Sequence, residues 1–294
     1  MFGAHGKILR VNLSEAKISQ EEFSESVLRK YLGGAGLATK YLWDETKKGI
    51  DPLSPDNELI FMTGALTGTV SPSTGRYSVV AKSPLTGIWG QSNSAGYFGT
   101  DFKRTGYDGV IFQGASAEPV YLVVDGEKAE LRSAKHLWGK SVSETTRLIK
   151  AELGGRFNVA CIGIAGENKV RYACIMNDLH RAAGRCGMGA GMGSKGLKAI
   201  AASGKEEIKI ADPVGFAKVS KKQYELLEQV LVRIAMETFG TNMAIDLVNM
   251  RGAYPTRNWQ TGVFDIENIS AVAMNERVLV EGVGCFACPI KCGR

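Results

Sequence analysis

Apolar residues follow two different periods along this chain, and the change falls near residue 205. Before that point, short apolar runs rich in β-branched residues, such as ELIFMT at residues 58–63, predict buried strands that alternate with helical segments. Strands are expected at residues 6–13, 58–63, 77–82, 109–113, 119–124, 129–134, 158–164, 171–176 and 197–202. Helices in this part are expected at residues 24–32, 37–43 and 142–153.

Local signals define the ends of two of these elements. Asp125 and Gly126 stand between two expected strands and predict a hairpin turn. Ser143 can cap the helix expected from residue 142, with an acidic residue in its first turn. Cys161 and Cys174 fall inside expected strands, where a cysteine usually acts as a small apolar residue.

Helical spacing dominates the rest of the chain. Asp212 followed by Pro213 is a helix start, and apolar residues keep a helical spacing from there to Gly240. Two further helices are expected at residues 243–250 and 269–280. We therefore predict an α+β protein. Residues 1–208 form a mixed α/β layered domain with two β-sheets and helices, and residues 209–294 form the start of an α-helical domain.

Composition and charge narrow the classes of function. The 36 basic and 30 acidic residues give a net charge of +6, which favours an anionic ligand or an acidic protein partner. No block of like charges is present, so a nucleic-acid-binding tail is not indicated. The uncharged runs are too polar to cross a bilayer, and the N-terminus lacks a signal pattern. We expect a cytoplasmic protein without nucleic-acid or membrane partners.

Three of the six cysteines form a C-x-x-C-x-x-x-C motif made of Cys285, Cys288 and Cys292. In the cytoplasm such clusters indicate metal rather than disulfides. Three thiolates can hold a [4Fe–4S] cluster when a fourth ligand comes from elsewhere. Structural zinc needs four ligands, and no second pair or nearby histidine is present, so iron–sulfur is favoured over zinc and over plain reduced thiols. Enzymes that cleave S-adenosylmethionine typically carry the reverse spacing, C-x-x-x-C-x-x-C, so this class of enzyme is disfavoured.

Glycine makes up 36 of 294 residues, about 12% against a usual ~7%. Three segments concentrate it together with arginine or asparagine: TGTVSPSTGRY at residues 67–77, SNSAGYFG at 92–99 and HRAAGRCGMGAGMGSK at 180–195. Backbone N–H groups of such loops bind anions, and arginine binds phosphate. Neither a dinucleotide fingerprint nor a P-loop is matched. The remaining alternative is that these glycines only serve turns and tight packing.

Several motifs in order resemble the tungsten-containing aldehyde:ferredoxin oxidoreductase family over essentially the whole chain. They are GRY at residues 75–77, KSPLTG at 82–87, NSAGYFG at 93–99, GYD at 106–108, GIAGEN at 163–168, NDLHRAAGR at 177–185, MGSK at 192–195 and the cysteine motif. The resemblance implies a tungsten bis-pterin (tungstopterin) that rests on the N-terminal domain, with a [4Fe–4S] cluster close by.

The resemblance also assigns site residues. It implies that six positions contact the pterin or its phosphates: Arg76, Asn93, Ala95, Arg181, Ala182 and Gly184. It places Arg76 between pterin and cluster, and it implies that backbone carbonyls of Asn93 and Ala182 hold a magnesium ion that bridges the two phosphates. Cys285, Cys288 and Cys292 match three of the four cluster ligands.

The function implied by the resemblance is oxidation of aldehydes to carboxylic acids with ferredoxin as electron acceptor. Family members are about twice as long, so we expect this sequence to be the N-terminal half, with the catalytic residues and the fourth cysteine outside it. Tungsten and molybdenum are not distinguished, and a homodimer is an alternative to a single chain. The competing hypotheses are a non-catalytic truncated fragment of such an enzyme and a phosphate-ligand (nucleotide) binding module.

Overall fold

The computed structural model describes all residues from 1 to 294, and they divide into two compact units. Unit 1 comprises Met1–Thr69 and Thr74–Pro213, and unit 2 comprises Val70–Ser73 and Val214–Arg294. The chain therefore leaves unit 1 for one short segment and returns to it. The second passage into unit 2 falls directly after Pro213.

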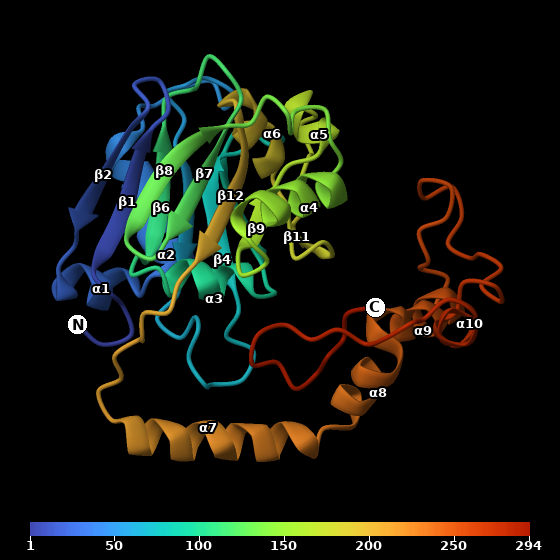
Figure 1. The fold of residues 1–294 in the computed structure, drawn as a ribbon. Coiled ribbons are helices and arrows are strands. Elements are labelled where there is room, and N and C mark those ends of the chain that lie inside the picture. Colours follow the sequence, from blue (N-terminus) through green and yellow to red (C-terminus); the bar gives the residue numbers. More distant parts are fainter. The chain divides into compact units, whose positions relative to one another are not determined.

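Unit 1 contains two six-stranded sheets, of which the first has the order β2-β1-β6-β3-β4-β5 (Figure 1). Its strands are β1 (Lys7–Asn12), β2 (Lys17–Glu22), β3 (Leu59–Thr63), β4 (Tyr77–Lys82), β5 (Trp89–Ser94) and β6 (Gly109–Gln113). Only β1 and β6 pair in parallel, and all other neighbours are antiparallel. Strand β5 is one edge of this sheet.

The second sheet has the order β11-β10-β9-β12-β7-β8, so β11 is one of its edges. Its strands are β7 (Val120–Asp125), β8 (Lys128–Ser133), β9 (Asn158–Cys161), β10 (Ile175–Asn177), β11 (Arg181–Ala183) and β12 (Leu197–Ser203). Strands β7 and β12 pair in parallel, and the others are antiparallel. The expected hairpin is confirmed, because Asp125 of β7 pairs with Lys128 of β8 across the turn.

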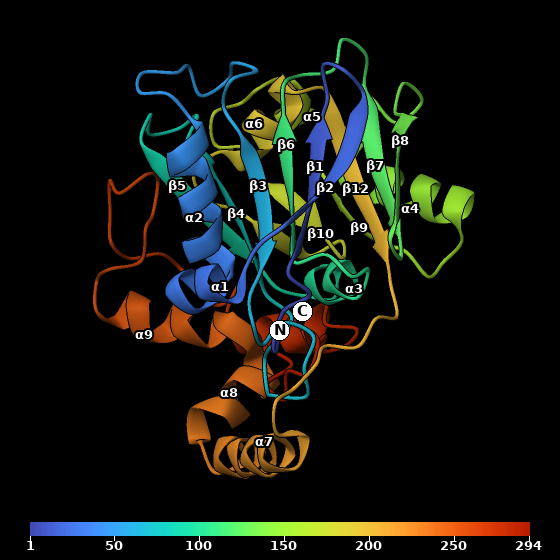
Figure 2. The same cartoon turned by 90° about the vertical axis from the view of Figure 1, so that its left-hand side faces the viewer.

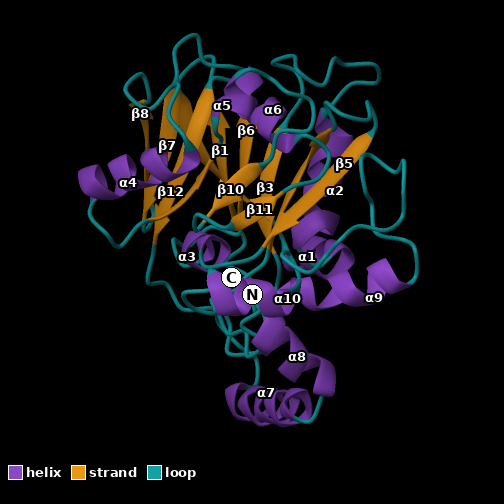
Figure 3. Ribbon diagram, turned by 90° about the vertical axis from the view of Figure 1, so that its right-hand side faces the viewer, coloured by secondary structure: helices purple, strands orange, loops and turns teal.

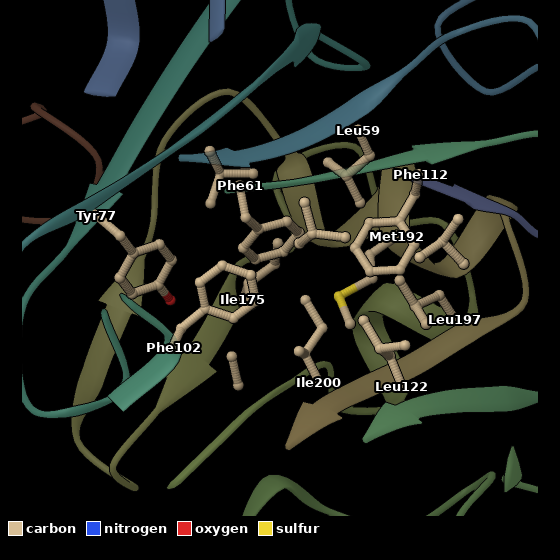
Figure 4. Close-up of a cluster of buried hydrophobic side chains, with 14 of the residues drawn as sticks. Leu59, Phe61, Tyr77, Phe102, Phe112, Leu122, Ile175, Met192, Leu197 and Ile200 are labelled. Carbon is tan, nitrogen blue, oxygen red and sulfur yellow. The ribbon is translucent and has the colours of Figure 1, made fainter. Parts of the chain in front are cut away.

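Alternating side chains of the strands build the core. In β3, Leu59 and Phe61 belong to the cluster between the two sheets, whereas Ile60 and Met62 belong to the cluster under the helices on the outer face. Figure 4 shows Phe61 beside Phe112 of β6, with ring centroids 6.0 Å apart in an edge-to-face arrangement. Each such fully buried side chain contributes about 1.5–3 kcal/mol from burial. A strand buried on both faces explains why its sequence is apolar without alternation.

Helices cover the outer faces of both sheets (Figures 2 and 3). Helices α1 (Glu25–Tyr31) and α2 (Gly34–Glu45) cover the first sheet, and α4 (Val142–Leu153) packs on β9 of the second. Ser24 caps α1 with its side chain, as expected of a serine before an apolar helix. Three shorter helices complete the unit: α3 (Phe98–Lys103), α5 (Ile164–Glu167) and α6 (Met188–Ser194).

Three of the boundaries predicted in unit 1 are wrong. The cap of α4 is Ser141 and not Ser143, since Ser141 and Glu144 form a reciprocal capping box. The strand expected at residues 158–164 ends at Cys161, because α5 starts at residue 164. The strand expected at residues 171–176 is shortened by a turn, in which the N–H of Ala173 donates to the carbonyl of Val170. Cys174 thus lies just before β10.

Unit 2 consists of helices and irregular segments. The helices are α7 (Pro213–Glu228), α8 (Leu231–Phe239), the 3₁₀ helix η1 (Gly240–Met243), α9 (Ala244–Met250) and α10 (Ala271–Arg277). The single helix expected to run to Gly240 is interrupted, because Val230 has an extended backbone with φ −86° and ψ 113°. No helix in either unit combines the length and the apolar character needed to span a bilayer.

Candidate functional site

The edge strands of the two sheets, β5 and β11, lie beside each other in unit 1. The N–H of Arg185, which follows β11, donates to the Ser92 hydroxyl of β5 at 3.0 Å. The hydroxyl of Ser83 donates to the carbonyl of Cys186 at 2.8 Å. These contacts bring the second and third glycine-rich segments of the sequence together, although about 90 residues separate them along the chain.

The first segment joins the same region through Arg76. Arg76 directly precedes β4, and its Nη1 donates to Asn93 Oδ1 on the neighbouring strand β5 at 3.2 Å. The ladder between these strands pairs Tyr77 with Ser94. Both Arg76 and Asn93 are exposed, so their polar groups are accessible to a ligand.

A buried amide connects the two edges. The side chain of Asn177 at the end of β10 is 1% exposed and makes four hydrogen bonds. Its Oδ1 accepts from the hydroxyls of Tyr77 at 3.0 Å and Ser94 at 2.6 Å, and its Nδ2 donates to the Ala95 carbonyl at 2.8 Å and to Asp178 Oδ2 at 2.8 Å. Burial raises the pKa of Tyr77, so its hydroxyl keeps its proton. The sequence analysis did not single out this residue.

Asp178 extends this connection to the second segment. Its carboxylate accepts N–H groups of Tyr97 at 2.6 Å and Phe98 at 3.4 Å. Asp178 and Leu179 both have positive φ angles, 49° and 63°, which non-glycine residues adopt at a cost and mainly where the surroundings hold them. The tight turn they form leads directly into β11, and its first residue Arg181 pairs with Asn177 in the ladder.

The assembled region is rich in positive charge. Arg76 and Arg185 are exposed and Arg181 is half-buried. Partial burial and the neighbouring charge of Arg181 lower the pKa of His180, so this imidazole is neutral at pH 7. Guanidinium groups and glycine-rich backbone can bind a ligand that carries phosphate. The chemistry of these groups fits an anionic cofactor.

Glycines of the third segment fall into two classes. Residues Met188–Ser194 form helix α6 rather than an open loop. A Cβ added to Gly193 would lie 1.9 Å from the Gly166 carbonyl of α5, and one added to Gly189 would lie 2.5 Å from the Cys174 carbonyl, so both glycines serve close packing. Gly184 differs, because its nearest neighbour would be Ala182 Cβ at 3.8 Å. The packing alternative therefore holds for Gly189 and Gly193.

The three cysteines of the C-x-x-C-x-x-x-C motif lie in one loop of unit 2. An isolated antiparallel bridge between Val283 and Gly293 closes this loop, with both hydrogen bonds at 2.9–3.0 Å. Within it, the N–H of Cys288 donates to the Cys285 carbonyl at 3.1 Å, and all three cysteines are half-buried.

No group of three or more His, Cys, Asp or Glu side chains in the structure has the geometry to hold a metal ion. An iron–sulfur cluster makes a different demand, since each thiolate binds its own iron and the sulfurs need not meet at one point. The three cysteine thiolates of this loop are the type of ligand that binds the irons of such a cluster. The assignment of Cys285, Cys288 and Cys292 as its ligands stays a prediction.

The other cysteines lie in unit 1. Cys161 is buried, and burial raises the pKa of its thiol to about 11, so it stays protonated. Cys186 packs against the core between the sheets. Its φ of +63° lies in the left-handed region that favours glycine.

A cavity of about 530 Å³ in unit 1 lies elsewhere. It is lined by side chains of α2 and of the segment leading into β5, among them Trp43, Ile88 and Trp89. None of the residues assigned above to cofactor binding lines it. We place the candidate site at the exposed edges of β5 and β11 because the charged groups gather there.

Comparisons with known proteins identify the family of this chain. Residues 8–204 match the sequence model described as aldehyde ferredoxin oxidoreductase, N-terminal domain, and residues 218–294 match that of its domains 2 and 3. A tungsten-containing aldehyde ferredoxin oxidoreductase of Pyrococcus horikoshii is 48% identical over 100% of this chain and 49% of its own length. The corresponding protein of Pyrococcus furiosus is 46% identical with the same coverage.

Two further proteins match this chain at lower identity. An aliphatic sulfonate oxidoreductase, WOR-like subunit, of Pyrococcus furiosus is 35% identical over 99% of this chain. A solved structure described as the active site complex BamBC of benzoyl coenzyme A reductase, with 1,5-dienoyl-CoA, superposes with a TM-score of 0.88 at 31% identity, covering 99% of this chain and 47% of its own. The chain spans about half the length of the curated relatives it matches. On both family models and these identities, the chain belongs to the aldehyde ferredoxin oxidoreductase family.

Proposed function

We propose that a protein containing this chain oxidises aldehydes to carboxylic acids. Water supplies the added oxygen, and two electrons and two protons leave for each aldehyde. The observation that carries the proposal is the arginine-bearing region at the edges of β5 and β11, in a chain 46–48% identical to tungsten-containing aldehyde ferredoxin oxidoreductases. Because the chain spans about half of those relatives, the activity is proposed for a chain of their length.

In this proposal the residues of unit 1 bind and orient a tungsten bis-pterin. That group supplies the two-electron chemistry when it is bound. Arg181 neutralises phosphate charge and Arg76 tunes the electronics between pterin and cluster, while Asn93, Ala95, Ala182 and Gly184 line the ligand with backbone and small side chains. The amide of Asn177 supports this role, since it fixes the segments that carry Ala95 and Arg181.

Three further assignments belong to the proposal. Cys285, Cys288 and Cys292 hold a [4Fe–4S] cluster, and backbone carbonyls of Asn93 and Ala182 hold a magnesium ion. Ferredoxin accepts the electrons, which the basic net charge of +6 supports through faster association with an acidic partner. A cytoplasmic location is supported by six cysteines without a disulfide.

Metal and cofactor analysis tests this proposal directly. The full-length protein, produced anaerobically with tungstate, should contain tungsten, four irons and a fluorescent pterin after extraction, and it should reduce a viologen dye with an aldehyde. Arg181→Gln should lower the bound pterin, whereas Arg171→Gln should not, because Arg171 is an exposed arginine outside the region. Zinc alone, with no extractable pterin, would refute the proposal. If the protein contained molybdenum in place of tungsten, the metal would differ from the one proposed, and the proposed pterin, cluster and reaction would stand.

A further inference from the structure

Residues Val70–Ser73 belong to unit 2, and they reach the cysteine loop. The hydroxyl of Ser73 donates toward the Sγ of Cys288 at 3.4 Å. A thiolate bound to iron carries no proton and can only accept, so the serine is the donor in this pair. The contact joins residues 215 positions apart in the sequence.

The backbone holds this hydroxyl in place. The N–H of Ser73 donates to the carbonyl of Ala287 at 2.8 Å, and the hydroxyl of Tyr224 in α7 donates to the same carbonyl at 3.0 Å. Ser73 and Ala287 have φ angles of +62° and +50°. Such backbone conformations persist in non-glycine residues when their surroundings hold them. Two donors on one carbonyl therefore fix the residue next to Cys288 relative to Ser73.

Hydrogen bonds to ligand sulfurs are one of the means by which a protein sets the potential of an iron–sulfur cluster. We propose that Ser73 is a positioning residue that raises the reduction potential of the cluster held by Cys288, and this inference rests on the cluster in the proposed function. On reduction the cluster gains one electron and no proton. The added negative charge spreads onto the thiolates, so a donor at Cys288 stabilises the reduced form more than the oxidised form.

The expected size of the effect follows from the strength of one charge-assisted hydrogen bond, which is worth roughly a tenfold change in an equilibrium. Ser73 is exposed, so water replaces part of the bond when the hydroxyl is removed. We expect the ratio of reduced to oxidised cluster at a fixed potential to fall three- to tenfold. For a one-electron couple this corresponds to about 30 to 59 mV toward more negative potential.

The test is a redox titration of the cluster in the full-length protein, followed by electron paramagnetic resonance. Ser73→Ala removes the hydroxyl, and Ser73→Gly removes it while suiting the positive φ. Ser71→Ala is the matched control, because the Ser71 hydroxyl in the same segment donates to Gln223 Oε1 at 3.0 Å. Both Ser73 variants should shift to lower potential with unchanged iron content, and the control should keep the wild-type potential.

Each other outcome has a defined meaning. Equal potentials in all four proteins, or an equal shift in the control, would overturn the role of Ser73 while leaving the proposed function intact. Loss of iron in both Ser73 variants would assign the residue to cluster retention and overturn the tuning role. A wild-type protein without an iron–sulfur signal would refute the cluster itself, and this inference with it.

Discussion

Removal of the buried amide at the junction of the two sheets should destabilise the protein strongly. Asn177→Ala deletes four hydrogen bonds and leaves the buried hydroxyls of Tyr77 and Ser94 and the carbonyl of Ala95 without their partner. At about 1 kcal/mol net for each bond, the sum is about 4 kcal/mol. Water entering the vacated space recovers part of it, so we expect a loss of about 3 kcal/mol.

Urea denaturation and thermal unfolding of the chain, both followed by circular dichroism, measure this loss. The melting temperature should fall by about 6–12 °C, at 2–4 °C for each kcal/mol in a protein of this size. Asn168→Ala is a suitable control, since Asn168 is exposed at the end of α5. Asn168→Ala should change the free energy of unfolding by no more than about 0.5 kcal/mol.

A double-mutant cycle makes the argument specific. If the Tyr77 hydroxyl is stabilised by Asn177, Tyr77→Phe should cost at least about 1 kcal/mol less in the Asn177→Ala background than in the wild type. Strict additivity of the two substitutions would refute the hydrogen-bonded connection. So would a loss below about 1 kcal/mol for Asn177→Ala alone.

Three further predictions concern local features of unit 1. Ser141→Ala should cost about 1 kcal/mol by thermal unfolding because it removes the capping box, whereas Ser143→Ala should change little. Gly193→Ala should destabilise the protein by several kcal/mol, because the added Cβ would lie 1.9 Å from a backbone carbonyl oxygen. Gly191→Ala should stabilise it by about 0.5–1 kcal/mol, because no neighbour lies nearer than 3.9 Å. If Gly191→Ala destabilised the protein more than Gly193→Ala, the packing argument would be contradicted. Burial raises the pKa of Glu58 to about 7. The folded state then holds a proton that the unfolded state has lost between about pH 4.5 and 7, so Glu58→Gln should gain stability over the wild type as pH rises through this window, and a pH-independent difference would contradict it.

Strands buried on both faces are among the elements that the sequence predicted well. Strand β4 was expected and found at Tyr77–Lys82, and β6 at Gly109–Gln113. Strand β2, with the sequence KISQEE, was missed because it is a mostly exposed edge strand whose pairing with β1 outweighs its polar composition. Strand β5 was missed because of its polar composition, since WGQSNS reads as a loop until it pairs with β4.

The candidate site was predictable only in part. The arginines and glycine-rich segments carry a signal in sequence, because their residue types indicate an anionic ligand. The supporting residues carry none that we recognised. Asn177 and Ser73 act through hydrogen bonds to residues 100 and 215 positions away, and spacing along the chain does not encode such contacts. Asn177 begins the motif at residues 177–185 and is a polar residue at the end of an apolar strand, but neither signal indicates which groups its amide contacts.

The segment Val70–Ser73 belongs to unit 2 although the residues on both sides of it belong to unit 1, and this limits how unit 2 can be exchanged between proteins by recombination. A recombination event at Pro213 would carry off the helices of unit 2 and leave behind the four residues that support their cysteine loop. The two units are therefore not exchangeable as single continuous segments, although the sequence pattern changes at one point. Grafting the cysteine loop onto another scaffold would require transplanting both stretches of chain.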